Sequence, residues 1–400
     1  MKTIFLAAGK SSRMAPFEEK NLLSFCGKPL IQHLIENAQK GGLGPFIIVC
    51  NKKNKPVFEK ILFSQKNCSF VLQEDLKTGM AGGVLAGLSQ IQKNEPIFIL
   101  GGNDFVSFQI YKKIIQEGEK HDGSLLAKKV SHYFPGGYLS FSSKKILSTL
   151  IEKPVPGKEP SSFINIVAHY FKNSQDLKQA LLSATSSHDD IYETALQSLF
   201  QTKKFKAVFY NDFWETIKYP WHILSMMKKF LFSQKSFIAP SVQIADTARI
   251  RGKGVILSDG VRLFDNAVVV GPCFIGKNTI IGNNALVRES NIGDNCIIGY
   301  NSEVARSFLN NNVQTHIAYV GDSVIDSGVN FGAFSCTANL RLDQKDIKIT
   351  LLKNKNRINS QRQKLGSIIG KNTQIGIHAL MMPGCILPKN SFINPNEIKK

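Results

Sequence analysis

An aliphatic residue recurs at every sixth position through long stretches of the second half of the chain. A period of six is neither helical nor the alternation of an ordinary strand. It is expected when a short strand and a corner occupy six residues and three such pieces close one triangular coil. The runs are Ile238, Ile244, Ile250 and Ile256; Leu263, Val269, Ile275, Ile281 and Val287; Ile292, Ile298 and Val304; and Ile369, Ile375, Met381, Leu387 and Ile393. We interpret them as the interior of a left-handed parallel β-helix, because sandwich strands vary in length and would lose this phase.

Glycine and asparagine follow the aliphatic positions, where the corners of the coil are expected. Ile275-Gly276-Lys277-Asn278 is one example and Ile292-Gly293-Asp294-Asn295 is another. Both residue types tolerate the backbone angles that a tight corner demands. The resulting prism has flat sides, and such sides commonly pack around a three-fold axis. We therefore expect a homotrimer.

The first half of the chain has the pattern of a Rossmann-like, doubly wound α/β sheet. Thr3–Ala8 is a short apolar run that predicts a buried strand, and further apolar runs at 46–50, 70–72 and 97–100 are separated by helix-like stretches. In such sheets, ligands bind at the carboxyl ends of the strands. We expect one domain at residues 1–224, a helical linker at 225–237 and the β-helix at 238–400.

Charge and cysteine usage narrow the functional class. The 400 residues carry a net charge of +20, for which nucleic-acid binding is the first explanation. No known nucleic-acid-binding motif occurs in the sequence, and phosphorylated small substrates also call for lysine and arginine, so we expect no nucleic-acid partner. The seven cysteines include no CxxC pair, which is typical of reduced thiols in a cytoplasm. The apolar run at Thr3–Ala8 is too short for a secretory core or a membrane span. We expect a cytoplasmic protein without a membrane partner.

A loop of small residues, Gly9-Lys10-Ser11-Ser12-Arg13-Met14, follows the first strand. A strand, a glycine loop and then a helix aim backbone N–H groups at a phosphate. With Lys20 and Gly27-Lys28-Pro29-Leu30, this loop resembles the opening of the sugar-1-phosphate nucleotidylyltransferases, with Ser11 in place of the usual second glycine. The resemblance implies that Arg13 holds the triphosphate and that Lys20 bridges both phosphates. It assigns nucleotide contacts to Leu6, Ala8 and Gly9.

The region after residue 70 extends this resemblance to the base. Gln73 with Thr78-Gly79-Met80-Ala81-Gly82-Gly83 is similar to the segment in which a glutamine and backbone groups read a pyrimidine and exclude purines. The resemblance implies that Gln73 and Gly79 bind the nucleotide, and that the nucleotide is UTP or dTTP.

Metal and sugar contacts are implied at later strand ends. Asp104 follows Ile99-Leu100-Gly101-Gly102-Asn103 in the manner of the family's magnesium aspartate, so Mg²⁺ is the implied cofactor. Gly137, Glu152 and Asn165 fall where the family binds the sugar of a sugar 1-phosphate. Carboxylate and amide groups suit sugar hydroxyls because they offer paired acceptors and donors.

The segment Trp214–Leu224 contains the main departure from this family. It resembles the family's Trp-x-Asp-Ile-x-x-Pro ending, but Thr216 stands where the second metal ligand is expected. A neutral hydroxyl is a poorer Mg²⁺ ligand than a carboxylate. The adjacent Glu215 would point to the opposite face of an extended segment. We expect weaker metal binding, and with it weaker uridylyl transfer.

The second half resembles the acetyltransferase half of the bifunctional enzymes that make UDP-N-acetylglucosamine. The similarity rests on His316–Val324, Val329–Ala333 and Thr337–Asp343. With the first half, the resemblance covers nearly the whole chain. Two departures occur: Ala305, next to Arg306, replaces a phosphate-binding lysine, and Phe334 replaces a glycine.

Acetyl transfer to an amino sugar needs a free amine, which is largely protonated near neutral pH. A histidine can take that proton because its ordinary pKa lies near neutrality, so His316 is the candidate general base. The resemblance implies acetyl-CoA as the co-substrate. It assigns the remaining substrate contacts to Arg288, Tyr319, Asn330, Asn339, Lys345 and Lys348.

We expect a bifunctional enzyme that acetylates glucosamine 1-phosphate and then uridylylates the product to UDP-N-acetylglucosamine, with release of pyrophosphate. Three alternatives stay open. One is a single-activity glucose-1-phosphate uridylyl- or thymidylyltransferase with a structural prism, against which the intact His316 segment argues. The second is an acetyltransferase whose first domain only binds nucleotide, which Thr216 favours. The third is a trimeric, non-enzymatic regulator that binds sugar nucleotides.

Overall fold

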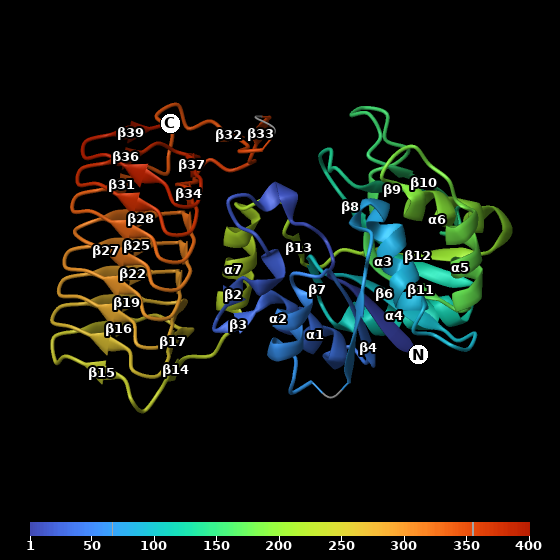
Figure 1. Ribbon diagram of the computed structural model, residues 1–400, viewed down its shortest axis with the longest axis horizontal. Coiled ribbons are helices and arrows are strands. Elements are labelled where there is room, and N and C mark those ends of the chain that lie inside the picture. The colour runs from blue at the N-terminus through green and yellow to red at the C-terminus, as the bar shows by residue number, and fades with distance from the viewer. Residues whose placement is uncertain (66, 354–355) are drawn as a thin grey trace. The chain divides into compact units, whose positions relative to one another are not determined.

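The computed structural model describes residues 1–65, 67–353 and 356–400 (Figure 1). The chain forms two compact units. The first unit comprises Met1–Lys10 and Ile31–Trp214, and the second comprises Ser11–Leu30 and Glu215–Lys400. The segment Ser11–Leu30 therefore belongs with the second half of the chain, although it follows the first strand directly in sequence.

The first unit is built on a mixed sheet whose centre is parallel. β1 (Lys2–Leu6) lies between β4 (Phe46–Cys50) and β6 (Ile97–Gly101), and β5 (Cys68–Leu72) pairs with β4, all in parallel. The strand order on the main path is β10-β9-β11-β6-β1-β4-β5. The apolar runs at 46–50, 70–72 and 97–100 thus form strands, as their composition predicts.

Antiparallel strands complete this sheet on the β6 side. The central one is β11 (Phe163–Phe171), which pairs with β6, with β8 (Gly123–Lys129) and with β9 (Gly137–Phe141). β10 (Leu147–Glu152) is antiparallel to β9, and β12 (Phe205–Tyr210) is parallel to β8.

Helices cover both faces of the sheet. Ile97 and Ile99 face a core that includes residues of α3 (Gly79–Leu88), α5 (Ser174–Ser183) and α6 (Ile191–Thr202). Side chains alternate across a strand, so Phe98 faces the other side, where its ring meets Tyr111 of α4 (Gln109–Glu119) at 5.9 Å. The remaining helices of this region are α1 (Leu30–Lys40), α2 (Lys55–Ile61) and the 3₁₀ turn η3 (Leu76–Thr78).

The second unit contains a prism of three parallel sheets with eight strands each, which appear as stacked coils in Figure 1. The first sheet comprises β14 (Phe237–Ile238), β17 (Val255–Leu257), β20 (Cys273–Ile275), β23 (Asn291–Ile292), β26 (Phe308–Leu309), β29 (Val324–Ile325), β34 (Ile368–Ile369) and β37 (Ile386–Leu387). The second comprises β15 (Gln243–Ile244), β18 (Arg262–Leu263), β21 (Ile280–Ile281), β24 (Ile297–Ile298), β27 (Gln314–Thr315), β30 (Asn330–Phe331), β35 (Gln374–Ile375) and β38 (Phe392–Ile393). The third comprises β16 (Arg249–Arg251), β19 (Val268–Val270), β22 (Leu286–Arg288), β25 (Glu303–Ala305), β28 (Tyr319–Gly321), β31 (Cys336–Thr337), β36 (Leu380–Met381) and β39 (Ile398–Lys399). This is the predicted left-handed parallel β-helix.

The interior of the prism follows the six-residue pattern with one correction. All the predicted positions from Leu263 onward are buried. The prediction is wrong at Ile256, because Leu257 occupies the interior position instead. Gly252 and Gly254 both have positive φ, and this corner contains one extra residue, which shifts the phase. Ile238 and Ile244 are 45% and 42% exposed because the first coil has a coil on only one side.

The coils continue through the region between Val304 and Ile369, where the aliphatic period is not evident in the sequence. Thr315 and Thr337 occupy interior positions there and are fully buried. Both make hydrogen bonds to polar atoms, as buried hydroxyls require: Thr315 Oγ1 donates to Ser302 Oγ at 3.0 Å, and Gly321 N donates to Thr337 Oγ1 at 3.0 Å. Hydrogen-bonded threonines therefore replace aliphatic residues without breaking the coil.

Replacing Phe331 by alanine is expected to lower the free energy of unfolding of the prism by about 3 to 5 kcal/mol, because it removes a fully buried ring and leaves a cavity. Chemical denaturation would measure the change. Phe392→Ala in the same sheet is the matched control, since Phe392 is 78% exposed and its loss should change stability by less than about 0.5 kcal/mol. Equal effects of the two substitutions would contradict the interior assignment.

In its described residues, the second unit also contains a helix, two hairpins and two 3₁₀ turns outside the prism. α7 (His222–Phe232) lies where a helical linker at 225–237 is predicted, and it both begins and ends earlier than that range. The hairpin β32 (Lys348–Thr350) and β33 (Arg357–Asn359) lies between β31 and β34 in sequence. The segment Ser11–Leu30 holds the 3₁₀ turns η1 (Ser12–Met14) and η2 (Lys20–Leu22) and the hairpin β2 (Ser24–Phe25) and β3 (Lys28–Pro29). β7 (Asp104–Val106) belongs to the first unit, and β13 (Trp214–Thr216) lies where the chain passes from the first unit into the second.

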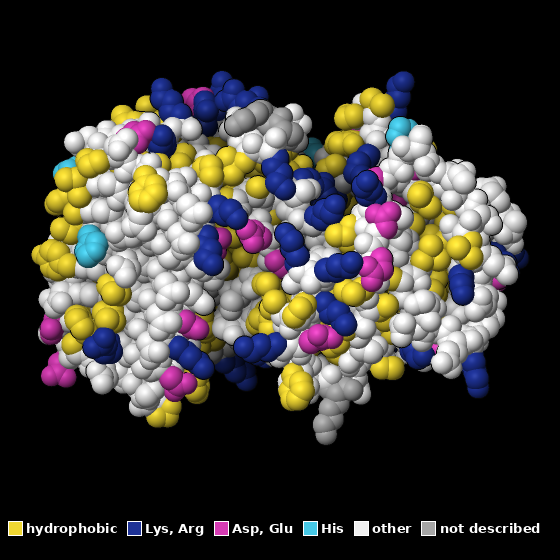
Figure 2. All heavy atoms as spheres, viewed as in Figure 1, with side chains coloured by type: hydrophobic (Ala, Val, Ile, Leu, Met, Phe, Trp, Pro, Cys, Tyr) yellow, Lys and Arg dark blue, Asp and Glu magenta, His cyan; other side chains and the backbone are white. Residues whose placement is uncertain are grey.

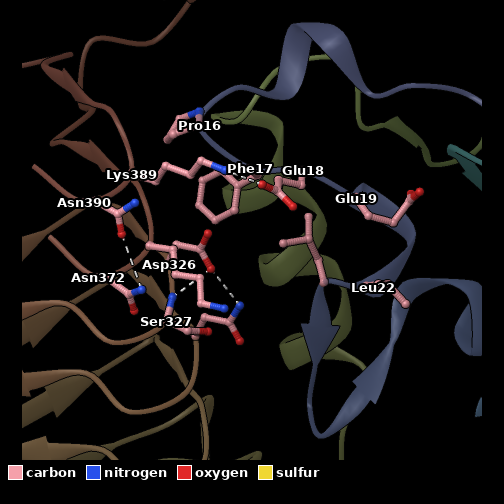
Figure 3. A pocket seen from close by; sticks show the side chains of 13 residues that line it. Pro16, Phe17, Glu18, Glu19, Leu22, Asp326, Ser327, Asn372, Lys389 and Asn390 are labelled. Atoms are coloured by element: carbon pink, nitrogen blue, oxygen red, sulfur yellow. Dashed lines mark hydrogen bonds and ion pairs between the residues drawn. The ribbon is translucent and has the colours of Figure 1, made fainter. Parts of the chain in front are cut away.

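The segment Ser11–Leu30 packs against the prism and α7. The Phe25 ring lies 5.3 Å from the rings of both Phe230 and Phe308. The Cys26 N–H donates to Asn291 Oδ1 at 2.8 Å. A cavity of about 470 Å³ is lined by residues of the segment and of the prism, among them Phe17 and Asp326, whose side chains Figure 3 shows. Beside it, Lys389 Nζ meets Glu18 Oε1 at 2.7 Å. Apolar, backbone and charged contacts thus hold the segment on the prism.

None of the helices in the described part of the chain has the length and apolarity that crossing a bilayer requires.

Candidate active sites

The loop after β1 presents an open backbone. Gly9 is exposed, and a Cβ placed on it would meet no atom within 4 Å. Packing therefore does not require glycine here, and the missing side chain leaves room for a ligand to approach the backbone. A single 3₁₀ turn at Ser12–Met14 follows the loop in place of the α-helix that the strand–loop–helix arrangement predicts. That part of the prediction is wrong, and only the loop N–H groups remain for phosphate binding.

Two buried asparagines that the sequence analysis did not single out hold the start of this loop. Asn54 Nδ2 donates to the Ala7 carbonyl at 2.8 Å, and Asn51 Nδ2 donates to the Ala8 carbonyl at 3.0 Å. Two buried side chains therefore hold both carbonyls, which fixes the backbone where the loop begins. Their signal in the sequence is an Asn-x-x-Asn step directly after the buried run that forms β4.

Gln73 anchors the turn that precedes α3. Its buried side chain donates from Nε2 to the Gly79 carbonyl at 2.8 Å and to the Asp75 carbonyl at 3.2 Å. Gly79 has φ 55° and ψ −140°, and a Cβ there would lie 2.1 Å from Asp189 Oδ1. The structure thus brings Gln73 and Gly79 together, and it explains the glycine by backbone strain and by lack of space.

Asp104 begins β7, close to the carboxyl end of β6. Its Oδ1 accepts a hydrogen bond from Trp214 Nε1 at 3.0 Å. No group of three or more acidic, cysteine or histidine side chains suited to a metal occurs among the described residues. Mg²⁺ often binds through one or two carboxylates and completes its shell with water and substrate phosphates. A single carboxylate fixed through one oxygen fits that kind of site.

The three predicted sugar contacts lie together. Gly137 pairs with Glu152 across β9 and β10. A Cβ on Gly137 would lie 3.2 Å from Glu152 Oε2 and 3.7 Å from Asn165 Cβ. Glu152 also meets Lys153 Nζ at 2.9 Å. These contacts place a carboxylate and an amide side by side, next to a buried glycine whose Cβ position Leu150 Cδ1 would crowd at 2.7 Å.

A cavity of about 160 Å³ joins this sugar cluster to the turn before α3. Its lining includes Thr78 from the turn, Met80 from α3, Glu152 from β10, and Tyr192 and Glu193 from α6. Burial raises the pKa of the Glu193 carboxyl to about 8, and the nearby Glu152 charge adds to the effect. The α6 residues were not predicted, because no motif in the sequence links them to the site.

Arg13 and Lys20 belong to the second unit, whereas the other predicted nucleotide contacts belong to the first. The exposed Arg13 guanidinium lies over the Tyr219 ring at 5.9 Å from its centre. Lys20 begins η2 and is half-buried. Both cations therefore lie on the segment that packs against the prism.

Thr216 ends β13 and is buried. Its carbonyl lies 2.8 Å from His222 Nδ1. Burial raises the pKa of the neighbouring Glu215 carboxyl to about 7, and the positive charge of Arg362 opposes that rise. Glu215 therefore lies in the field of Arg362.

The candidate base of the second site, His316, follows β27 at an exposed corner of the prism. Ile317 at this corner has φ 45°, and its carbonyl accepts from the Phe334 N–H of the next coil at 3.1 Å. The chain then enters β28 at Tyr319. The imidazole is thus presented to solvent by a corner that is fixed on both sides by backbone hydrogen bonds.

Tyr319 and Asn339 meet through their side chains. Asn339 Nδ2 donates to Tyr319 Oη at 3.2 Å and also to Asp322 Oδ2. Arg306 donates two hydrogen bonds, of 2.8 and 2.7 Å, to the same carboxylate. Asp322 is buried and was not predicted as a site residue. Arg306, which neighbours the missing lysine position, is therefore engaged with Asp322.

The other predicted acetyltransferase contacts are more dispersed. Arg288 on β22 donates to Glu303 Oε1 at 2.7 and 3.0 Å. Lys345 and Lys348 are exposed on the excursion between β31 and β34. Asn330 Oδ1 on β30 is buried and has no hydrogen-bond donor among the described residues. A buried acceptor without a partner is costly, so a donor from a ligand would be favoured there.

Phe334 replaces the glycine that the resemblance predicts, and it adopts φ 61° at a corner. Its ring stacks on His378 of the following coil, with centroids 4.9 Å apart and planes inclined by 13°. The strained backbone is thus accompanied by an aromatic contact at the surface.

Comparisons with known proteins find relatives that match nearly the whole chain. The chain is 32% identical to a bifunctional sugar-1-phosphate nucleotidylyltransferase/acetyltransferase of Sulfurisphaera tokodaii, over all of this chain and 97% of that relative. It is 30% identical to a bifunctional protein GlmU of Methanococcus maripaludis, over 99% of this chain and 94% of that relative. The family described as MobA-like NTP transferase domain matches residues 3–153. The crystal structure of a UDP-glucose pyrophosphorylase complexed with UDP-glucose has a similar fold, with a TM-score of 0.50 and 19% identity over 58% of this chain and 99% of that chain.

Proposed function

Because the chain belongs to the family of bifunctional sugar-1-phosphate nucleotidylyltransferase/acetyltransferases, we propose that it makes UDP-N-acetylglucosamine in two steps. It first acetylates glucosamine 1-phosphate with acetyl-CoA, and then transfers a uridylyl group from UTP to the product. The observation that supports this proposal is the presence of two separate groups of polar side chains in one chain. One is the Gly137, Glu152 and Asn165 cluster, and the other surrounds Tyr319 and Asn339.

In the acetyl-transfer step, His316 takes a proton from the sugar ammonium, and the free amine attacks the thioester carbonyl of acetyl-CoA. The C–N bond forms as the C–S bond breaks, and coenzyme A leaves as the thiol. Tyr319 and Asn339, which are already bonded to each other, would orient the sugar. Arg288, Lys345 and Lys348 supply cations for phosphate groups, and Asn330 Oδ1 offers an acceptor.

In the uridylyl-transfer step, an oxygen of the sugar phosphate attacks the α-phosphorus of UTP, and pyrophosphate leaves. The protein contributes position and charge more than covalent chemistry. Arg13, Lys20 and the N–H groups of the loop at Gly9 hold phosphates. Gln73 and Gly79 contact the base. Mg²⁺, when bound, neutralises phosphate charge, and Asp104 would hold it.

We further propose that the functional division follows residues 1–224 and 238–400 with the linker 225–237, and that the protein works in the cytoplasm.

Incubation with glucosamine 1-phosphate, acetyl-CoA, UTP and Mg²⁺, omitting each in turn, tests the function. Thiol release should require only the first two reagents, and pyrophosphate release should require all four. Pyrophosphate release from UTP with glucose 1-phosphate, without acetyl-CoA, would instead favour a single-activity enzyme. The absence of both products would favour a regulator.

We propose a homotrimer formed through the prism. Hydrophobic side chains lie along one edge of the prism in Figure 2. At the corners between its second and third sheets, Phe264, Tyr300, Phe334 and Ile377 are 37 to 52% exposed. Repeated apolar side chains along an edge favour association. Sedimentation of the full chain at micromolar concentration should show a trimer, and a monomer alone would contradict the proposal.

Thr216→Asp is expected to lower the Mg²⁺ concentration needed for half-maximal uridylyl transfer, because a charged oxygen returns to the proposed metal position. Pyrophosphate release measured against Mg²⁺ concentration would show the shift. Thr216→Asn is the matched control, since it adds a side chain of similar size without charge. An equal Mg²⁺ requirement in both variants would mean that residue 216 does not contact the metal.

A further inference from the structure

A fully buried histidine lies directly behind the sugar cluster, and the reaction steps above do not use it. His169 on β11 has no exposed surface. Its Nε2 is 2.8 Å from Asn165 Oδ1, and its Nδ1 is 2.7 Å from the Tyr192 hydroxyl. The His169 and Tyr192 rings are stacked with planes only 7° apart. Tyr192, His169 and Asn165 thus form a chain of side chains from α6 to the sugar cluster.

An irregularity in β11 makes this contact possible. Residues four apart on a regular strand share a face but are separated by roughly 13 Å, since each residue adds about 3.3 Å. In β11, Ile166 pairs with Leu126 and His169 pairs with Leu125, so two residues of β11 are inserted opposite consecutive residues of β8. Such bulges bend a strand and re-aim its side chains. This one brings the Asn165 and His169 side chains into contact.

The chemistry of the three groups fixes the direction of the hydrogen bonds. Burial lowers the pKa of His169 to about 3, so the ring is neutral and has one N–H and one acceptor nitrogen. The carboxamide oxygen of Asn165 only accepts. Nε2 therefore donates to Asn165 Oδ1, and the Tyr192 hydroxyl donates to Nδ1.

The other end of the Asn165 amide is available. With Oδ1 held by His169, the Nδ2 group points away from the imidazole and makes no hydrogen bond to any residue in the described ranges. It belongs to a side chain that neighbours Gly137, beside Glu152. Two N–H donors are thus offered where the carboxylate of Glu152 offers acceptors.

We propose that His169 is a positioning residue of the uridylyl-transfer site, which fixes the Asn165 amide so that its N–H groups bind an acceptor oxygen of the sugar phosphate. This inference rests on the proposed function. An amide that is free to rotate would also turn its oxygen toward the ligand and would no longer offer an ordered donor. Tyr192 supports the arrangement by holding the opposite nitrogen of the ring.

Steady-state kinetics of pyrophosphate release with N-acetylglucosamine 1-phosphate and UTP test this role. His169→Phe should raise the KM for the sugar phosphate by about ten-fold, the scale of one lost hydrogen bond in a built site. The KM for UTP should stay the same. His169→Gln keeps a donor at the ε position and should restore most of the affinity. Tyr192→Phe should have a smaller effect of about three-fold, because Nε2–H remains.

A double substitution shows whether His169 acts through Asn165. If it does, adding His169→Phe to Asn165→Ala should cause no further rise in KM, because the two side chains form one unit. Tyr170→Phe, on the same strand, is the control for loss of a buried phenol and should leave both KM values unchanged. Melting temperature and thiol release from acetyl-CoA report on folding for every variant.

The outcomes separate two failures. If the unsubstituted protein releases no pyrophosphate with any sugar phosphate, the proposed function is wrong. If the unsubstituted protein is active while His169→Phe retains its KM for the sugar phosphate, or if the two substitutions add fully, the positioning role is overturned and His169 only packs β11 against α6.

Discussion

Replacing His316 by alanine is expected to lower acetyl transfer by about 10² to 10⁴ fold, the usual contribution of one acid–base group. The imidazole is exposed at a corner of the prism, where a substrate ammonium would have access to it. Binding of acetyl-CoA should change little, because His316 meets the amine and not the co-substrate. Thiol release, followed with a colorimetric reagent, measures the loss.

Two further measurements distinguish a general base from a structural residue. Raising the pH should partly restore acetyl transfer by the His316→Ala variant, because a larger fraction of the substrate amine is then already deprotonated. Uridylyl transfer to ready-made N-acetylglucosamine 1-phosphate should be unaffected. His378→Ala is the matched control, because His378 is an exposed histidine at a later corner of the same prism and stacks on Phe334. Near-normal acetyl transfer by His316→Ala at neutral pH would rule out the catalytic role.

The prism was predictable from the sequence because its interior positions recur at a fixed spacing of six residues. Each inward position needs an aliphatic side chain and each corner needs a tolerant backbone, and both requirements recur every six residues. The prediction failed at Ile256, where an extra corner residue shifts the phase. The six-residue pattern also did not identify Thr315 and Thr337 as interior positions of their coils. Hydrogen-bonded threonines satisfy the interior there, and no hydrophobic pattern marks them.

The sugar cluster was predictable to a different extent. Gly137, Glu152 and Asn165 were identified by resemblance, and the structure brings them together through adjacent strands. His169 and Tyr192 could not be found that way. Their contact with Asn165 depends on two inserted residues in β11 and on the packing of α6. No local sequence motif indicates such an irregularity in strand pairing.

Asp322 illustrates the same limit in the second site. It follows β28 at a corner with φ 47°, which in the sequence indicates only a turn. The structure shows that it is buried and that it joins Arg306 to Asn339. Its role as the centre of that network depends on the stacking of consecutive coils, which places residues sixteen and seventeen positions apart side by side.

Lys20→Ala is expected to lower pyrophosphate release by about 10² to 10³ fold, by analogy with the loss of one charge-stabilising donor in a transition state. Lys20 lies on the segment Ser11–Leu30, which packs on the prism through Phe25 and Cys26. Acetyl transfer should persist, because removing a half-buried ammonium leaves those contacts intact. Pyrophosphate and thiol release, measured on the same preparation, report the two activities separately.

The control for this substitution is Lys389→Ala. It removes the ion pair between the prism and Glu18 of the same segment, and because both side chains are more than half exposed, its loss should change stability little. Uridylyl transfer should therefore fall only slightly. If Lys389→Ala were as damaging as Lys20→Ala, anchoring of the segment would be the limiting factor. If Lys20→Ala instead abolished both activities, the two sites would not be independent, and the charge of Lys20 would be contributing to the fold that they share.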